Sequence, residues 1–164
     1  MNMEEGTITG TYEIAMQIME ELFAKDYQFA MATAQNNQPS VRFVDTFFHD
    51  GSFFVVTYAK SQKVQELEGN SHVALTNRLY RFRGRGRNLG HPLRPENYEI
   101  RSKLVEVFAP WYFAHNNEDD ENMCYVQIEP VEGFFYQDGT GYEVNFPERT
   151  VKVFPFEHDI IPSS

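Results

Sequence analysis

Two lysines and a serine follow directly after an apolar run near the middle of the chain. Residues 53–59 are aromatic and β-branched, which favours a buried strand, and Ser61 is a residue type that commonly caps the start of a helix. The first turn of a helix has backbone N–H groups without partners, and Lys60 and Lys63 add positive charge there. Such a turn can bind a phosphate group. An ordinary strand-to-helix turn with two solvated lysines is the favoured interpretation of this segment alone, and the phosphate site is the alternative.

A stripe of alternating arginines is a second candidate site. Side chains two residues apart in a strand point to the same face, so this segment predicts one positive stripe made of Arg81, Arg83, Arg85 and Arg87. Because the rest of the chain is acidic, pairing with Asp and Glu side chains, within the chain or across subunits, is the favoured interpretation. A phosphate ligand and nucleic acid are the alternatives. Gly84 and Gly86 would let another backbone or a flat ligand approach closely, or mark a bulge.

The remaining polar residues predict no metal site and no catalytic side chain. The histidines lack paired metal-ligand spacing, and the single cysteine, Cys124, is interpreted as a passive strand residue. The acidic segment 116–122 lacks the alternating ligands and central glycine of an EF-hand, so we expect a solvated loop.

The composition predicts one folded unit that avoids polyanions. With 164 residues, 41% of them hydrophobic, the chain can form a single packed domain over residues 1–164. A formal net charge of -10 disfavours binding to nucleic acid or to an anionic membrane. Neither a signal sequence nor an apolar run of about 18 residues is visible, so a cytoplasmic protein is expected.

Periodic segments predict an antiparallel β structure with a few helices. Helices are expected over residues 11–25, 61–69 and 95–115, the last bent or ended early by Pro110. Strand-like runs cover residues 27–34, 40–48, 53–59, 72–77 and the arginine-rich stretch, then 123–129, 133–137, 142–146 and 151–154. Their hairpin-like succession predicts an antiparallel barrel with helices outside it rather than a parallel sheet. No phosphate-binding glycine motif of the nucleotide folds is present.

The order and spacing of these segments resemble the pyridoxamine 5'-phosphate oxidase-like family of FMN-binding split barrels. The similar segments are the strands at 29–33, 39–44 and 53–57, the turn at 60–63, and the following strands at 73–75 and 82–86. The resemblance covers most of residues 11–135. It implies a mainly β (α+β) fold, an antiparallel six-stranded split β-barrel with flanking helices.

The resemblance also implies where the cofactor FMN would lie. In the family an arginine-led strand runs along the flavin, the end of the next strand meets the ring or ribityl chain, and a Ser-x-Lys-like turn holds the phosphate. Carried onto this chain, the implied cofactor-binding residues are Arg42, Phe43, Val44, Thr57, Tyr58, Ser61 and Lys63. Backbone amides would contact the polar ring edge, and cations would neutralise the phosphate.

The chain departs from the family pattern in two places. Gln62 stands where relatives often carry an arginine, so Arg42 or Lys60 would have to compensate at the phosphate. The segment 151–158 differs from the Trp- and Arg-rich ending of true pyridoxamine phosphate oxidases. The vitamin B6 reaction is therefore not predicted.

The function implied by the resemblance is that of an FMN-dependent oxidoreductase that forms a homodimer, with flavin pockets at the subunit interface. A small-molecule substrate and NAD(P)H are the expected partners, and the flavin would carry out the electron transfer. Two alternatives remain. The barrel would bind deazaflavin F420 or haem in place of FMN, or it would be a non-enzymatic flavin-binding or stress-associated protein.

Overall fold

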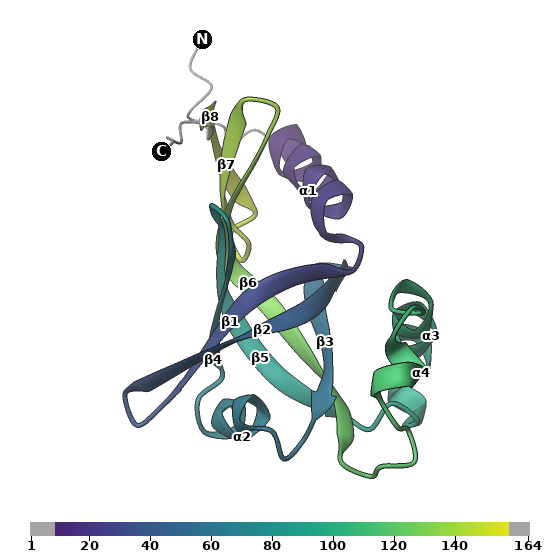
Figure 1. The fold of residues 1–164 in the computed structure, drawn as a ribbon. Coiled ribbons are helices and arrows are strands. Elements are labelled where there is room, and N and C mark those ends of the chain that lie inside the picture. Colours follow the sequence, from purple (N-terminus) through teal and green to yellow (C-terminus); the bar gives the residue numbers. More distant parts are fainter. Residues whose placement is uncertain (1–8, 158–164) are drawn as a thin grey trace, which may run out of the picture.

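The chain forms a closed six-stranded antiparallel β-barrel with two additional strands and a few helices (Figure 1). The computed structural model describes residues 9–157; residues 1–8 and 158–164, including His158, lie outside the described part. The barrel strands are β1 (Tyr27–Gln35), β2 (Gln38–His49), β3 (Ser52–Tyr58), β4 (His72–Asn77), β5 (Tyr80–Gly90) and β6 (Met123–Gln137). Hydrogen bonding runs in the order β3-β2-β1-β4-β5-β6, and β3 pairs with β6 to close the barrel. The predicted split-barrel fold is confirmed.

Tight turns connect the hairpins of the barrel. Asp50 and Gly51 between β2 and β3, and Asp138 and Gly139 at the end of β6, all have positive φ angles. Two successive residues with positive φ form the turn whose twist matches a two-residue β-hairpin, and Asp-Gly is a favoured pair there. Both reversals lie in the gaps that separate the predicted strands, at residues 49–52 and 138–141.

Strand β6 is longer than predicted. It runs without a break through Pro130, because a bulge accommodates the proline: Gly84 of β5 lies opposite Pro130 while Arg83 lies opposite Glu132, which leaves Val131 as the extra residue. The second half of β6 extends beyond the barrel. There it pairs with β7 (Thr140–Asn145), which pairs with β8 (Thr150–Pro155).

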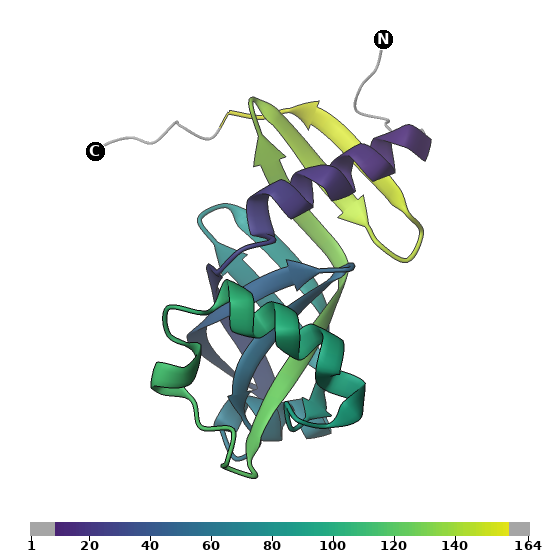
Figure 2. The same ribbon diagram turned by 90° about the vertical axis from the view of Figure 1, so that its right-hand side faces the viewer.

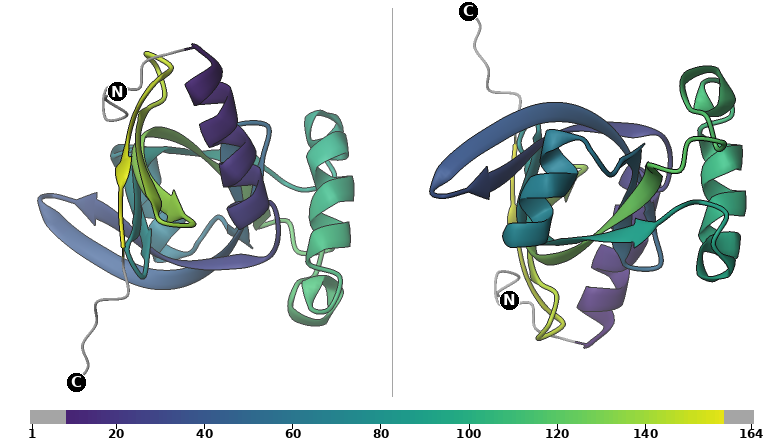
Figure 3. Two further views of the ribbon diagram at one scale, coloured as in Figure 1. Left: turned by 90° about the horizontal axis from the view of Figure 1, so that it is seen from above. Right: turned by 90° about the horizontal axis from the view of Figure 1, so that it is seen from below.

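The helices cover three different surfaces of this sheet. Helix α1 (Thr9–Phe23) lies across β7 and β8 (Figure 2), and α2 (Gln62–Gly69) covers one end of the barrel (Figure 3). The predicted helix at 95–115 is divided into a 3-10 turn, η2 (Pro95–Asn97), and two helices, α3 (Tyr98–Val107) and α4 (Tyr112–His115). The interruption contains Pro110, which cannot donate a helical hydrogen bond. None of the described helices is long and apolar enough to cross a membrane.

Two hydrophobic clusters hold these elements in place. The first fills the barrel, where the rings of Phe29, Phe53 and Phe82 meet edge to face or tilted, and Phe23 of α1 joins them. The second lies outside the barrel, between α3, α4 and the outer face of β3 and β6. Burial on both faces fixes the position of β3, the strand that leads into the predicted phosphate turn.

Candidate functional site

Strands β2 and β3 separate soon after their hairpin turn. They pair over only three residue pairs, ending where Phe47 lies opposite Phe54. Beyond that point β2 is paired only with β1, and β3 only with β6. In the described chain, residues 42–46 of β2 and residues 55–58 of β3 therefore face each other without being paired. We call this opening the β2–β3 seam. Its backbone N–H and C=O groups are available to a ligand, because no sheet ladder occupies them.

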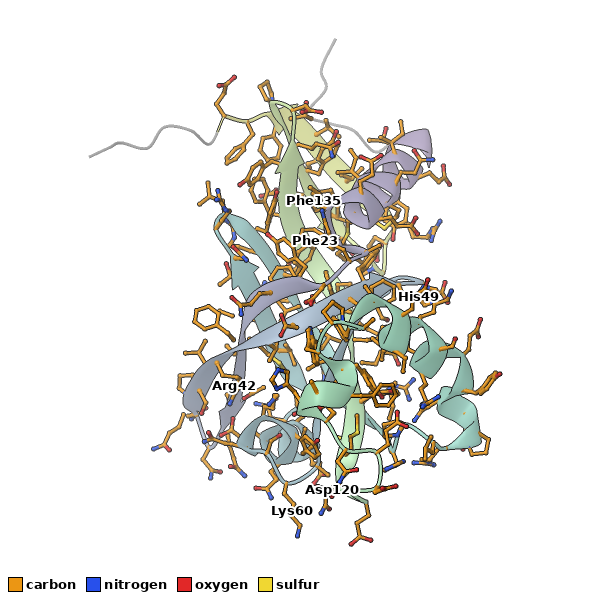
Figure 4. The ribbon with its side chains drawn as sticks, turned by 45° about the vertical axis from the view of Figure 1, so that its right-hand side comes forward. Phe23, Arg42, His49, Lys60, Asp120 and Phe135 are labelled. Carbon is orange, nitrogen blue, oxygen red and sulfur yellow. The ribbon has the colours of Figure 1, made fainter. Side chains whose placement is uncertain are left out.

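Three of the predicted site residues lie on the β2 side of the seam, and their side chains alternate. Val44 is buried in the barrel core, at 7% exposure, so only its backbone faces the seam. Phe43 points to the opposite face and is 73% exposed. Arg42, on the same face as Val44, lies at the end of the barrel beside α2 (Figure 4).

Thr57 and Tyr58 form the β3 side of the seam. The Oγ1 atom of buried Thr57 lies 3.5 Å from Oγ of Ser61, which joins the end of β3 to the start of α2. Tyr58 points the other way, packs against the α3 and α4 cluster, and its hydroxyl accepts the backbone N–H of Asn117 at 3.3 Å. The structure therefore brings Thr57 and Ser61 together and places the Tyr58 ring apart from them.

Two cations lie at the α2 end of the seam. Burial, together with the positive charge of Arg42, lowers the pKa of Lys63 below its usual value. Among residues 9–157 no carboxylate lies within ion-pair distance of Lys63. Lys60 is exposed, and Figure 4 shows it at the outer tip of the molecule, away from Arg42. Lys63 therefore lies within the electrostatic reach of Arg42, whereas Lys60 lies away from Arg42.

A buried glutamate completes this end of the seam, and sequence reasoning missed it. Glu66 is 5% exposed, and its Oε1 accepts a hydrogen bond from Oγ1 of Thr33 at 2.6 Å and lies 3.8 Å from Nη2 of Arg42. Its Oε2 accepts from Oγ of Ser40 at 3.2 Å. The hydrogen bond from Thr33, with smaller contributions from Ser40 and the charge of Arg42, lowers the pKa of Glu66 despite its burial. Glu66 is therefore an anion at neutral pH.

Arg42 is held by several acceptors in addition to this carboxylate. Its Nη1 donates to Oγ1 of Thr33 at 2.7 Å and to the carbonyl of Met31 at 3.3 Å. We refer to Thr33, Ser40, Arg42 and Glu66 as the Arg42–Glu66 cluster. Lys63 and Glu66 are three residues apart on a helix, and this spacing predicts at most a surface ion pair. The burial of Glu66 becomes visible only in the fold, where β1 and β2 approach α2.

The arginine stripe lies on the outer face of β5, as predicted, but its partners differ. Among the described residues, Arg83 is the one arginine of the four that pairs with a carboxylate, that of Glu132. Arg81 lies over the ring of Phe134, Arg85 donates to Ser71, and Arg87 donates to Gln127. Pairing within the described chain is therefore found for Arg83, and pairing across subunits stays a prediction.

Two hollows on the outer face of the sheet lie near this stripe. One of about 550 Å³ is lined by residues of β1, β2, β4, β5 and β6, Thr33 among them, and one of about 750 Å³ is lined by residues of β4, β5, β6, β7 and β8. Neither is lined by Arg42 or Lys63. The two cations thus lie outside the lining of both hollows, although Thr33, whose hydroxyl accepts a hydrogen bond from Arg42, lines the smaller one.

The other candidate groups show no reactive arrangement. Burial raises the pKa of the Cys124 thiol to about 11, so the thiolate is not populated at neutral pH. The expectation of a solvated acidic loop is wrong at Glu118, whose side chain is 13% exposed and accepts two hydrogen bonds from Arg101 at 2.8 Å. The described residues hold no group of three or more His, Cys, Asp and Glu side chains that would bind a metal.

Several solved structures share this fold. A NimC/NimA family protein from Clostridium acetobutylicum is 18% identical with a TM-score of 0.55, covering 85% of this chain and 94% of its own. A pyridoxamine 5'-phosphate oxidase-related, FMN-binding protein from Nostoc punctiforme is 12% identical with a TM-score of 0.52, covering 90% and 96%. A haem-binding protein from Mycobacterium smegmatis is 10% identical with a TM-score of 0.58, covering 77% and 55%. At these identities the likeness shows the fold alone.

The sequence was also compared with protein families and with curated proteins. The search of curated proteins gave no match. The family model described as pyridoxamine 5'-phosphate oxidase matches residues 16–137, which include both strands of the seam, the turn into α2 and the whole barrel. The match spans well over half of the chain and agrees with the observed split barrel. The chain therefore belongs to the pyridoxamine 5'-phosphate oxidase-like split-barrel family.

Proposed function

We propose that the chain is an FMN-binding flavoprotein, and an oxidoreductase that acts on a small molecule. The observation that carries the proposal is the β2–β3 seam, whose unpaired backbone edges end at the two cations Arg42 and Lys63. A flavin mononucleotide has a flat ring with a polar edge and a phosphate at the end of a flexible chain. Binding of such a ligand requires hydrogen-bonding groups for the ring edge and positive charge for the phosphate, and the seam offers both.

Different residues of the chain would bind the two ends of FMN. Backbone groups of residues 42–46 and 55–58 would hydrogen-bond the ring edge, and the buried hydroxyl of Thr57 lies at the same end of β3. Lys63 and Arg42 would hold the phosphate, with the Ser61 hydroxyl close by. When bound, the flavin supplies the hydride and electron transfer, so no acidic or basic side chain is required for the chemistry.

A homodimer is part of the proposal. Phe43 and Val41 on the outer face of β2 are 73% and 68% exposed, which is unusual for large apolar side chains on a strand. Across the sheet they lie opposite the small residues Ala30 and Ala32 of β1. A second copy packed on this face would bury Phe43 and shield the seam from water. Light scattering on the purified protein measures the mass directly, and a monomer at all concentrations would remove this part of the proposal.

The proposal also includes the hydride donor and the cellular location of the protein. NAD(P)H is the proposed hydride donor because it is the common reductant of flavins in cells, and the proposed location is the cytoplasm, where that donor is abundant. A mixture of FMN-loaded protein and NADPH under anaerobic conditions would bleach the flavin absorbance. Bound flavin that no nicotinamide reduces would favour the flavin-binding, non-enzymatic alternative.

The absorption spectrum of the purified protein tests the cofactor. FMN-loaded protein absorbs near the two visible flavin bands and releases a compound with the mass of FMN on heating. A haem or a deazaflavin gives a different spectrum and a different mass, and those ligands are the alternatives within this fold. Protein that is colourless and binds none of the three in titrations would refute the proposal. The pair of cations favours FMN or F420 over haem because both carry phosphate.

A further inference from the structure

The phosphate end of the seam contains a carboxylate as well as two cations. Glu66 is ionised and lies 3.8 Å from Arg42, so Arg42, Lys63 and Glu66 together carry a net charge of about +1. A phosphate monoester carries close to two negative charges at pH 7. The site is therefore only partly matched to the charge of such a ligand.

We propose that Glu66 is a specificity-determining residue, which reduces the preference of this site for a flavin that carries a phosphate monoester over the same flavin without phosphate. The inference rests on the proposed function for the identity of the ligand. Its physical basis is direct: a buried carboxylate beside Arg42 repels an incoming phosphate, and it also competes with that phosphate for the guanidinium.

A purely structural role for Glu66 predicts the opposite result. If Glu66 only orients Arg42 toward the phosphate, its neutralisation loosens Arg42 and weakens the binding of FMN. If Glu66 opposes the phosphate, neutralisation strengthens the binding of FMN and leaves riboflavin unchanged. The sign of the change therefore separates the two roles.

Glu66→Gln is the appropriate variant because it removes the charge and keeps an oxygen that accepts the hydrogen bond of Thr33. Dissociation constants of FMN and riboflavin are measured by quenching of flavin fluorescence. The ratio of riboflavin to FMN dissociation constants is expected to rise about 10-fold in Glu66→Gln, the size expected for one screened charge a few ångströms away. Glu68→Gln is the matched control: Glu68 lies on the same helix but is exposed, and its variant should keep the wild-type ratio.

Inorganic phosphate provides a test that does not depend on flavin. Phosphate is titrated while the thermal unfolding midpoint is recorded, and the increase in midpoint is expected to be larger in Glu66→Gln than in the wild type. If this holds while neither protein binds FMN or riboflavin, the proposed function fails and the role of Glu66 stands. A phosphate effect that is equal, smaller or absent in Glu66→Gln overturns the inference.

A second variant covers the case in which Glu66→Gln does not fold. Gln62 is exposed, and its Nε2 lies 3.5 Å from Oγ of Ser40, so Gln62→Glu adds a carboxylate beside the Arg42–Glu66 cluster without altering the core. The inference predicts a smaller phosphate-induced increase in the unfolding midpoint for Gln62→Glu than for the wild type. An unchanged or larger increase contradicts it.

Discussion

The hydroxyl oxygens of Tyr112 and Tyr125 lie 2.5 Å apart in a fully buried contact that joins α4 to β6. Tyr112 donates its own proton to Oε2 of Glu118 at 2.8 Å, so the proton between the two rings comes from Tyr125. Burial raises the pKa of both phenols, that of Tyr125 to about 12, and both stay neutral. This chain of hydrogen bonds holds α4 against β6, the strand that pairs with β3 of the seam.

Tyr112→Phe is expected to destabilise the protein by about 1–3 kcal/mol, because it leaves the buried hydroxyl of Tyr125 without its acceptor and removes one of the hydrogen bonds that Glu118 accepts. Urea unfolding followed by circular dichroism measures the loss. The matched control is Tyr98→Phe, which removes a hydroxyl from a side chain that is 76% exposed and should change stability by less than about 0.5 kcal/mol. Equal effects of the two substitutions would show that the buried contact contributes nothing.

The pH dependence of stability is expected to report on Asp45. Burial, followed by the hydrogen bond and the charge of Asp26, raises the pKa of Asp45 to about 6. The folded state therefore holds this proton more tightly than the unfolded state, and the stabilisation is complete below about pH 4 and lost as pH rises through about 6.

Asp45→Asn should remove this dependence and make the protein more stable than the wild type at pH 7–8, by about 1 kcal/mol because Asp45 is only partly shielded from water. Unfolding midpoints between pH 4 and pH 8 provide the measurement. Glu148→Gln, which neutralises an exposed carboxylate, should keep the wild-type profile. A wild-type profile in Asp45→Asn would exclude Asp45 as the titrating group.

Lys63→Ala is expected to weaken FMN about 10-fold or more while changing the dissociation constant of riboflavin little, because only FMN carries the phosphate. Lys60→Ala is the control, since Lys60 is exposed and lies apart from Arg42 (Figure 4). Fluorescence titrations of both flavins give the ratios. Similar losses for FMN and riboflavin in Lys63→Ala would show that Lys63 does not touch the phosphate.

The bulge in β6 makes a prediction about Gly84. A Cβ atom at this position would meet the carbonyl oxygen of Glu129 and lie 2.8 Å from Cα of Pro130, both backbone atoms that cannot move aside. Gly84→Ala should cost about 1–3 kcal/mol of unfolding free energy. Gly69→Ala, at a position with no atom within 4 Å, should be neutral or slightly stabilising in the same urea titration.

The barrel could be predicted from the sequence because its strands follow one another in hairpins with recognisable turns. Asp50 and Gly51 have a single favoured geometry, and the strands that they connect pair as neighbours. The passage of β6 through Pro130 could not be predicted, since proline usually ends a strand and the bulge that tolerates it depends on the opposing Gly84.

The candidate site was predictable in part, for a related reason. The local signal of a helix start identified Ser61 and Lys63, and the family resemblance added Arg42. Glu66 was missed because its burial depends on Thr33 and Ser40, which are 33 and 26 residues away along the chain. Contacts over such separations follow from the fold and not from local spacing.

A crystal structure of the protein with FMN tests the central claim most directly. We predict the flavin ring in the β2–β3 seam, along residues 42–46 and 55–58, with a phosphate oxygen within hydrogen-bond distance of Nζ of Lys63. Flavin bound only elsewhere, for example in the larger hollow lined by residues of β4 to β8, would contradict the claim.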